Sequence, residues 1–309
     1  MYDKLVLVTR KTRLEELVER FNTKAQAKFY IEHSSGNFEI YEQEHATYYA
    51  ELGRLQRYLQ GIIKVQVVER AFLPNFFFSA SDLVVVFGID GLVVNTAKYL
   101  SGQPLVAVNP DPRHIDGVLL PFNVGNAPAA VRGVLAENHA IRPITMTEAM
   151  LNDGQRLLAF NDLFIGRHDH VSARYHIEAN GRAENHSSSG IIVSTGAGAT
   201  GWLSSLFNMA NGLLAGFGAG DGQAVPPQLG WDTDKLVFVV REPFVSKTSS
   251  AGLVCGLITA DSPLHLESYM PEGGVIFSDG VKSDYLPFNS GSIATIGLAA
   301  QKTNLVVSG

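Results

Sequence analysis

A single carboxylate between two glycines is the clearest candidate for chemistry in this chain. Asp90 lies between Gly88 and Gly91, directly after the unbroken apolar run 83–87. Backbone N–H groups beside a glycine can approach a phosphate closely, and a neighbouring carboxylate can accept a proton or position a nucleophile. Taken alone, an aspartate in such a turn more often bonds locally or caps a helix. The stretch therefore predicts a phosphate site only if other polar groups accompany it.

A second polar group interrupts the apolar strand pattern over residues 157–164. Asn161 and Asp162 stand side by side there. Adjacent strand residues point to opposite faces, so one of the pair would need a partner or a ligand inside. A bulge or hairpin corner also explains an isolated Asn-Asp pair, and for the pair alone it is the interpretation that we prefer.

A run of small residues over 187–205 is the third candidate. Gly196, Gly198 and Gly201 match G-x-G-x-x-G after a strand pattern and before a helix pattern. A dinucleotide fingerprint should open a parallel βαβ unit, whereas this run lies among antiparallel patterns, so we do not favour that interpretation. Exposed N–H and hydroxyl groups at a helix start still suit a phosphate or a ribose.

Strands and helices alternate over roughly the first 110 residues. We predict strands at 4–9, 28–32, 65–69, 83–87 and 104–109, and helices at 12–21, 42–61 and 92–102. This alternation predicts a parallel, doubly wound α/β sheet. Ligands bind where the strands of such sheets end, and Asp90 would lie there.

After residue 123 the pattern changes to short alternating runs, which predict a mostly antiparallel β domain. Asn180-Gly181 and the run 152–154 (Asn-Asp-Gly) are hairpin signals, because these residues tolerate φ > 0. We predict a helix at 127–137, a mobile glycine-rich loop at 212–227, and strands at 144–151, 157–164, 173–179, 190–194, 235–241, 264–268 and 274–278. The domains would be 1–123 and 124–288, and residues 289–309 would return to the first as a strand or helix.

Composition narrows the class of protein. The 309 residues carry a net charge of -6 and are 46% hydrophobic, which argues against nucleic acid or an anionic membrane as the main partner. The single cysteine, Cys255, excludes an intrachain disulfide and a cysteine-built zinc site. We find neither a signal peptide nor a spanning segment, and therefore expect a cytoplasmic protein.

Four motifs, in this order and spacing, resemble the ATP-NAD kinase family. They are Gly88-Ile-Asp-Gly91, the run 104–112 (Pro-Leu-Val-Ala-Val-Asn-Pro-Asp-Pro), Asn161-Asp162, and Ser194-Thr-Gly-Ala-Gly-Ala-Thr-Gly-Trp202. Asp279-Gly280 resembles a further Asp-Gly of that family. The resemblance covers nearly the whole chain, and the Ser-Ser-Gly lead-in to the last motif looks closest to the mitochondrial-type branch.

The resemblance implies an α/β first domain, a β-rich second domain and an active site in the crevice between them. It implies ATP-dependent phosphorylation of the adenosine ribose 2′-hydroxyl of NAD to give NADP. Asp90 would orient and deprotonate that hydroxyl, and Gly88 and Gly91 would bind phosphate. Mg²⁺ would accompany ATP to offset the charge of the transferring group.

The same resemblance assigns the acceptor to the second domain. Asn161 and Asp162 would grip its ribose and adenine. The dinucleotide-binding segment would include Thr195, Thr200, Gly201, Trp202 and Ser205. A homodimer or tetramer is also implied.

The chain departs from the family pattern at three positions. Ile89 replaces a glycine, so it would be strained if that position needs φ > 0 and would obstruct if phosphate must approach closely. Leu92 replaces a threonine, and Asp162 a glutamate. Two alternatives therefore remain open: a kinase of related fold with a sugar or lipid acceptor, and a dinucleotide-binding protein without catalysis.

Overall fold

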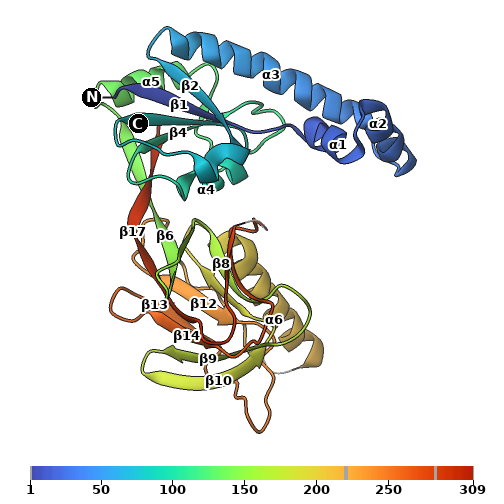
Figure 1. Ribbon diagram of the computed structural model, residues 1–309, viewed down its shortest axis with the longest axis vertical. Coiled ribbons are helices and arrows are strands. Elements are labelled where there is room, and N and C mark those ends of the chain that lie inside the picture. Colours follow the sequence, from blue (N-terminus) through green and yellow to red (C-terminus); the bar gives the residue numbers. More distant parts are fainter. Residues whose placement is uncertain (1, 219–221, 282–283, 309) are drawn as a thin grey trace. The chain divides into compact units, whose positions relative to one another are not determined.

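The computed structural model describes residues 2–218, 222–281 and 284–308, which form two compact units (Figure 1). Unit 1 comprises Met1–Arg142 and Thr303–Gly309, and unit 2 comprises Pro143–Lys302. These limits differ from the division at 123 and 288 expected from the sequence. The helix at 127–135 thus belongs to unit 1.

Unit 1 is built on a parallel sheet in the order β4-β3-β1-β2. Its strands are β1 (Lys4–Thr9), β2 (Val65–Glu69), β3 (Asp82–Phe87) and β4 (Pro104–Asn109). The chain first moves outward from β1 to β2 and then crosses to β3 on the other side of β1. The strand order therefore reverses between β1 and β3, which is where doubly wound sheets bind ligands. The predicted parallel α/β sheet is confirmed.

Two short pairings complete this sheet. β5 (Phe122–Asn123) pairs in parallel with the end of β4. The start of β4 pairs in parallel with Asn304 and Leu305, which lie near the end of β17 (Ile293–Val307). The C-terminal segment thus ends as a strand of unit 1.

Helices cover both faces of the sheet, and every residue of β3 and β4 is therefore buried. α3 (Phe38–Gln60) and α5 (Ala127–Leu135) pack on one face, while α4 (Asp90–Ala97) contacts β3 from the other (Figure 1). The short helix η1 (Arg70–Asn75) contacts α4. The shared core on the α3 side includes Leu7, Leu55, Val85, Val106 and Val131.

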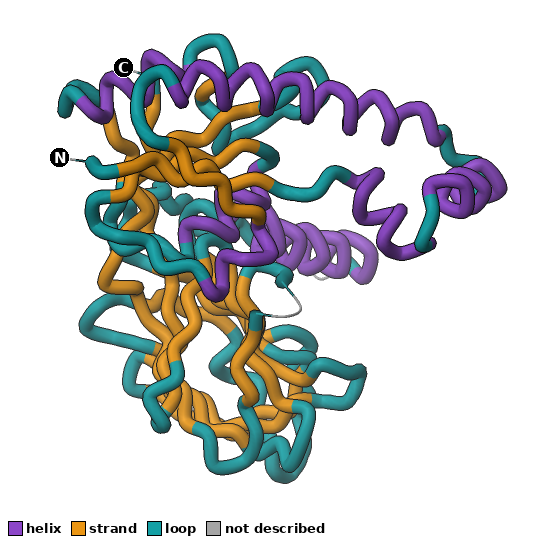
Figure 2. The backbone as a smooth tube through the Cα atoms, turned by 45° about the horizontal axis from the view of Figure 1, so that its top comes forward, coloured by secondary structure: helices purple, strands orange, loops and turns teal. Residues whose placement is uncertain are grey.

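The strand predicted at residues 28–32 is wrong: this segment lies within α2 (Lys24–His33). Thr23 caps the helix by accepting a hydrogen bond from the Gln26 backbone N–H at 3.2 Å. Ala27 and Ile31, one helical turn apart, join a small cluster with α1 (Arg13–Phe21) and the start of α3. Figure 2 shows the whole segment drawn as helix. Tertiary packing therefore selects the helix despite the aromatic, strand-like local sequence.

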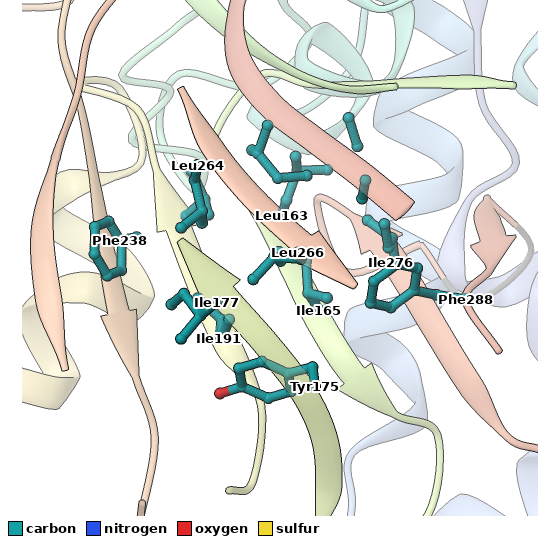
Figure 3. Close-up of a cluster of buried hydrophobic side chains, with 14 of the residues drawn as sticks. Leu163, Ile165, Tyr175, Ile177, Ile191, Phe238, Leu264, Leu266, Ile276 and Phe288 are labelled. Atoms are coloured by element: carbon teal, nitrogen blue, oxygen red, sulfur yellow. The ribbon is translucent and has the colours of Figure 1, made fainter. Parts of the chain in front are cut away.

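Unit 2 is built mostly of antiparallel strands, as its alternating sequence predicts, and these strands form two groups. The first group contains β6 (Ala140–Leu151), β7 (Arg156–Ala159), β9 (Ala173–Ala179), β10 (Arg182–Ser188), β14 (Leu264–Ser268) and most of β17. The second runs in the order β13-β12-β11-β8-β15-β16, with β8 (Asp162–Arg167), β11 (Ile191–Ser194), β12 (Leu236–Val240), β13 (Cys255–Ile258), β15 (Gly274–Ser278) and β16 (Tyr285–Pro287). Alternate residues of both groups form one core, part of which Figure 3 shows around Tyr175, Phe238 and Phe288.

The predicted hairpin at Asn180-Gly181 joins β9 to β10. Ala179 pairs with Arg182 across a two-residue turn. Asn180 has φ 53° and Gly181 has φ 71°. Both lie in the left-handed region that this turn requires, so a strong local signal sets the register of the hairpin.

The glycine-rich stretch predicted as a loop begins inside a helix. α6 (Ser204–Phe217) includes Gly212 and Gly216 and ends at Gly218, whose φ of 66° provides a left-handed cap. Residues 222–230 have no regular structure, and residues 219–221 lie outside the described residues. Within the described residues, no helix combines the length and apolar character needed to cross a membrane.

Candidate functional site

Asp90 is the first residue of α4, immediately beyond the carboxyl end of β3. Its Oδ2 accepts a hydrogen bond from the Val118 backbone N–H at 3.1 Å, and its Oδ1 accepts one from Leu119 at 3.0 Å. These bonds tie the loop after β4 to the start of α4 and fix the carboxylate. A carboxylate has about four lone-pair sites, so acceptor capacity remains for a substrate hydroxyl.

Ile89 is not strained beside this carboxylate. Its backbone is extended, with φ -111° and ψ 167°, and neither Gly88 nor Gly91 adopts a positive φ. The condition for backbone strain, a positive φ at this position, is therefore not met, which leaves the second expectation, that the side chain takes up ligand space. The Ile89 side chain is 38% exposed and lines a pocket, so its effect is on the space available to a ligand.

That pocket, here called the switch-point pocket, has a volume of about 580 Å³. Arg10 follows β1, Ile89 follows β3, and Asp111 and His114 follow β4. Residues of α3 form another part of its wall. It thus lies at the carboxyl ends of three strands, at the reversal of strand order, where ligand sites of such sheets occur.

Two arginines in this pocket share one carboxylate. Glu44 on α3 accepts hydrogen bonds from Arg10, at 2.9 Å, and from Arg13. Burial opposes ionisation of Glu44, but the hydrogen bonds from Arg13 and Arg10 outweigh it and hold the pKa of this carboxyl below its usual value. His114 Nδ1 lies 2.7 Å from an Asp111 oxygen. The Arg10–Arg13–Glu44 cluster therefore holds two positive charges and one negative charge, which gives it a net charge of about +1.

In unit 2, Asn161 and Asp162 mark a corner. The chain leaves β7 in one group of strands and enters β8 in the other. The Asp279 carboxylate fixes this corner by accepting the backbone N–H groups of Phe160 at 3.0 Å and Asn161 at 2.7 Å. The predicted corner is confirmed at this polar pair. Backbone groups hold the turn, so the side chains of Asn161 and Asp162 can still bind a ligand.

The surroundings of Asp162 disfavour the charged form of its carboxyl group. Burial, and then repulsion from the nearby Asp279 carboxylate, raise the pKa of Asp162 to about 7. A carboxyl group perturbed by burial and a specific charged neighbour is a candidate functional residue.

Thr195 and Gly198 pack directly against this corner, and the neighbouring Gly196 packs against Gly230. Thr195 is buried, and its hydroxyl donates to the Phe160 carbonyl at 2.6 Å. A Cβ at Gly198 would lie 2.2 Å from the Asn161 carbonyl oxygen, and one at Gly196 would lie 2.0 Å from that of Gly230. Close backbone approach therefore explains these two glycines without a dinucleotide fingerprint.

The remaining residues of this segment lie in three different settings. Thr200 lines a second pocket of about 640 Å³, together with Gly196, Ser204 and the chain at 226–231. Trp202, 36% exposed, instead stacks on Phe164 with ring centroids 5.8 Å apart. Gly201 and Ser205 bond to each other, the Ser205 hydroxyl donating to the Gly201 carbonyl at 3.3 Å. Among the expected residues, the structure thus gathers Asn161, Asp162 and Thr195 at the corner, with Thr200 at the adjoining pocket.

Sequence reasoning assigned no site role to Asp279 or to the Arg10–Arg13–Glu44 cluster. Asp279-Gly280 was recognised only as a motif, although an Asp-Gly pair directly after a strand is a usable signal. Arg10 directly follows the first strand, at its ligand-facing end, and Arg13 begins the helix after it. Glu44 carried no local signal, because its partners lie 31 and 34 residues away.

The pKa of Asp162 predicts a dependence of stability on pH. Its folded value of about 7 lies above the ordinary value near 3.8, so its favourable contribution is complete below about pH 4 and is lost as the pH rises towards 7. An Asp162→Asn variant should therefore gain more stability at pH 8 than at pH 5, by roughly 2 kcal/mol. Urea unfolding at both pH values measures this difference.

Asp153→Asn is the matched control, because Asp153 lies in an exposed turn where hydrogen bonds from Gln155 lower its pKa. It should show no such gain at pH 8. Equal behaviour of the two variants would contradict a raised pKa at Asp162.

No model of a known protein family matches the chain, and no curated protein matches its sequence. Solved structures do resemble it. Yeast NADH kinase in complex with NADH superposes with a TM-score of 0.58 at 13% identity, covering 100% of this chain and 84% of that one. An NAD kinase from Archaeoglobus fulgidus in complex with ATP superposes with a TM-score of 0.56 at 14% identity, covering 98% and 92%. The chain therefore has the NAD kinase fold, which confirms the fold class expected from its sequence.

Proposed function

We propose that this chain transfers the terminal phosphoryl group of ATP to the adenosine ribose 2′-hydroxyl of NAD or NADH. One observation carries the proposal: on an NAD kinase fold, the Asp90 carboxylate stands at a strand end, fixed by two backbone N–H groups. A fixed carboxylate with free lone pairs can accept the proton of an attacking hydroxyl. Asp90 is therefore assigned as the base that orients and deprotonates the acceptor.

Asn161 and Asp162 are assigned to the acceptor. The Asn161 amide offers both a donor and an acceptor, which suits the edge of an adenine, whereas an ionised carboxylate accepts hydrogen bonds from ribose hydroxyls. Because the pKa of Asp162 is about 7, this carboxyl group is mostly protonated below neutral pH. It must lose that proton before it can bind the ribose hydroxyls in this way. Thr200 lines the adjoining pocket and would supply a hydroxyl to the remainder of the dinucleotide.

Mg²⁺ is the expected companion of ATP in this reaction. Among the described residues, no group of three or more acidic, His or Cys side chains is arranged to hold a metal. Mg²⁺ usually keeps several waters and takes only one or two protein carboxylates beside substrate phosphates, so such a group is not required for this reaction. Asp111, at the switch-point pocket, is the carboxylate that would share the ion with the donor. When bound, Mg²⁺ offsets charge on the transferring group.

The test is to incubate the purified chain at high concentration with ATP, Mg²⁺ and either NAD or NADH. We expect NADP or NADPH, measured with a dehydrogenase that accepts only the phosphorylated cofactor. ADP release that requires another hydroxyl compound would instead indicate a different acceptor. If NAD raises the melting temperature while ATP with Mg²⁺ does not, and no product forms, the chain is a dinucleotide-binding protein without catalysis.

A further inference from the structure

We infer that the switch-point pocket binds the phosphate chain of the donor through Arg10 and Arg13, and that Glu44 occupies the place of this anion in the ligand-free protein. The ligand class is a polyphosphate ester such as a nucleoside triphosphate. The inference deepens the proposed function and rests on it for the identity of the ligand, but its geometry belongs to unit 1 alone.

The first argument is the unfinished hydrogen bonding of Arg10. Its Nη2 bonds Glu44 and its Nη1 donates to the Lys11 carbonyl at 3.0 Å. The Nε atom is buried and has no hydrogen-bond partner among the described residues. A buried donor without a partner costs free energy, and an anionic oxygen that takes the place of Glu44 can supply the missing acceptor.

The second argument is that Arg10 is held in place for this task. Its side chain is only 11% exposed, and its guanidinium lies 5.6 Å from the centre of the Tyr48 ring. The Tyr48 hydroxyl accepts the Arg10 backbone N–H at 3.1 Å and donates to the Phe87 carbonyl at 3.3 Å. These contacts join the ends of β1 and β3 and orient the guanidinium before a ligand arrives, which lowers the entropic cost of binding.

The third argument concerns charge. Two guanidinium groups face a single carboxylate, so the Arg10–Arg13–Glu44 cluster carries one net positive charge, while the other carboxylate of the pocket, Asp111, lies 2.7 Å from His114. A polyphosphate carries several negative charges and can bond both arginines in a bidentate manner, so it can replace Glu44, whereas a singly charged anion gains little by the exchange. Glu44 thereby favours polyanions over simple anions. The volume of about 580 Å³ leaves room for a larger ligand, whose apolar part can contact Ile40, Ile89 and Ile115.

Calorimetric titration with inorganic tripolyphosphate, without NAD or Mg²⁺, tests the pocket directly. Glu44→Gln removes the competing charge and should tighten binding about tenfold, whereas Arg13→Gln should weaken it about tenfold. Arg13→Lys keeps the charge but loses the planar fork, so it should fall between Arg13→Gln and the unaltered protein.

Matched controls lie on the same helix. Glu51 and Arg54 form an ion pair at 2.7 Å on α3, outside the pocket. Glu51→Gln and Arg54→Gln make the same charge changes and should alter the affinity less than twofold. Thermal unfolding verifies that every variant is folded, and the Arg13 variants suffice if Glu44→Gln does not fold.

The inference is overturned if Glu44→Gln binds tripolyphosphate no better than Glu51→Gln, or if Arg13→Gln binds it as well as Arg54→Gln. NADP formation with unchanged tripolyphosphate affinity in all variants would refute this pocket and leave the proposed function intact. Tripolyphosphate binding with the expected order of affinities, but without NADP formation, would refute the function and leave the pocket.

Discussion

An Asp90→Asn variant is expected to lose NADP formation by about 10²–10⁴-fold while it keeps its fold, because an amide cannot take the proton of the attacking hydroxyl. The amide oxygen can still accept one of the two backbone N–H groups that the carboxylate binds, those of Val118 and Leu119. The other loses its partner. We therefore expect a stability loss of only about 1 kcal/mol, since Val118 lies in an exposed part of the loop.

Asp3→Asn is the control for this variant. Asp3 lies just before β1, at the opposite end of the sheet, and accepts a hydrogen bond from the exposed Ser81 hydroxyl at 2.6 Å. It should leave turnover unchanged. Initial rates of NADP formation at saturating ATP and NAD measure both variants, and an Asp90→Asn protein that turns over like the unaltered one would remove Asp90 from the role of base.

Most of the strands that sequence reasoning located at their observed limits share one property. β4, β9, β14 and β15 each have Gly, Pro, Asn or Ser residues at or next to at least one end, and their pattern is either almost continuously apolar or strictly alternating, whereas β1 and β2 were located from their apolar residues alone. Both signals are local, so a single sequence contains them. The same holds for the Asn180-Gly181 turn, whose two positive φ values need no distant partner.

The errors lie where distant contacts decide the conformation. Ala27 and Ile31 belong to a helix because α1 and α3 offer an apolar surface on which only a helical face fits. The break at Asn161 depends on Asp279, which lies 118 residues further along the chain. No local pattern contains such information, since it arises only when the two segments meet.

The candidate site follows the same division. The motif around Asp90 was found because a strand, a turn and a helix follow one another directly in the chain. The raised pKa of Asp162 was not foreseen, because it results from burial and from Asp279. The Arg10–Arg13–Glu44 cluster was also missed, since it needs α1 and α3 to lie over the ends of β1 and β3. Sequence motifs thus located the candidate residues, whereas their electrostatics required the fold.

A large loss of stability is expected for Gly198→Ala. The new Cβ would lie 2.2 Å from the Asn161 carbonyl oxygen and 2.6 Å from its carbon, and both are backbone atoms. They cannot easily move, because the Asn161 N–H is bound by Asp279 at 2.7 Å and its carbonyl accepts the Thr195 N–H at 2.9 Å. We expect a loss of about 3 kcal/mol or more in the free energy of unfolding, at or above the upper end for overpacking.

Gly212→Ala provides the opposite case within unit 2. Gly212 lies inside α6, and a Cβ there would meet nothing within 4 Å, so alanine should stabilise the helix by up to about 1 kcal/mol. Urea unfolding curves compare the two variants. Because the displaced backbone carries Asn161 and Asp162, Gly198→Ala should also weaken NAD binding more than tripolyphosphate binding. Equal stability of the two variants would show that the segment 195–198 does not pack on the corner as described, and would remove the structural basis for assigning the acceptor to it.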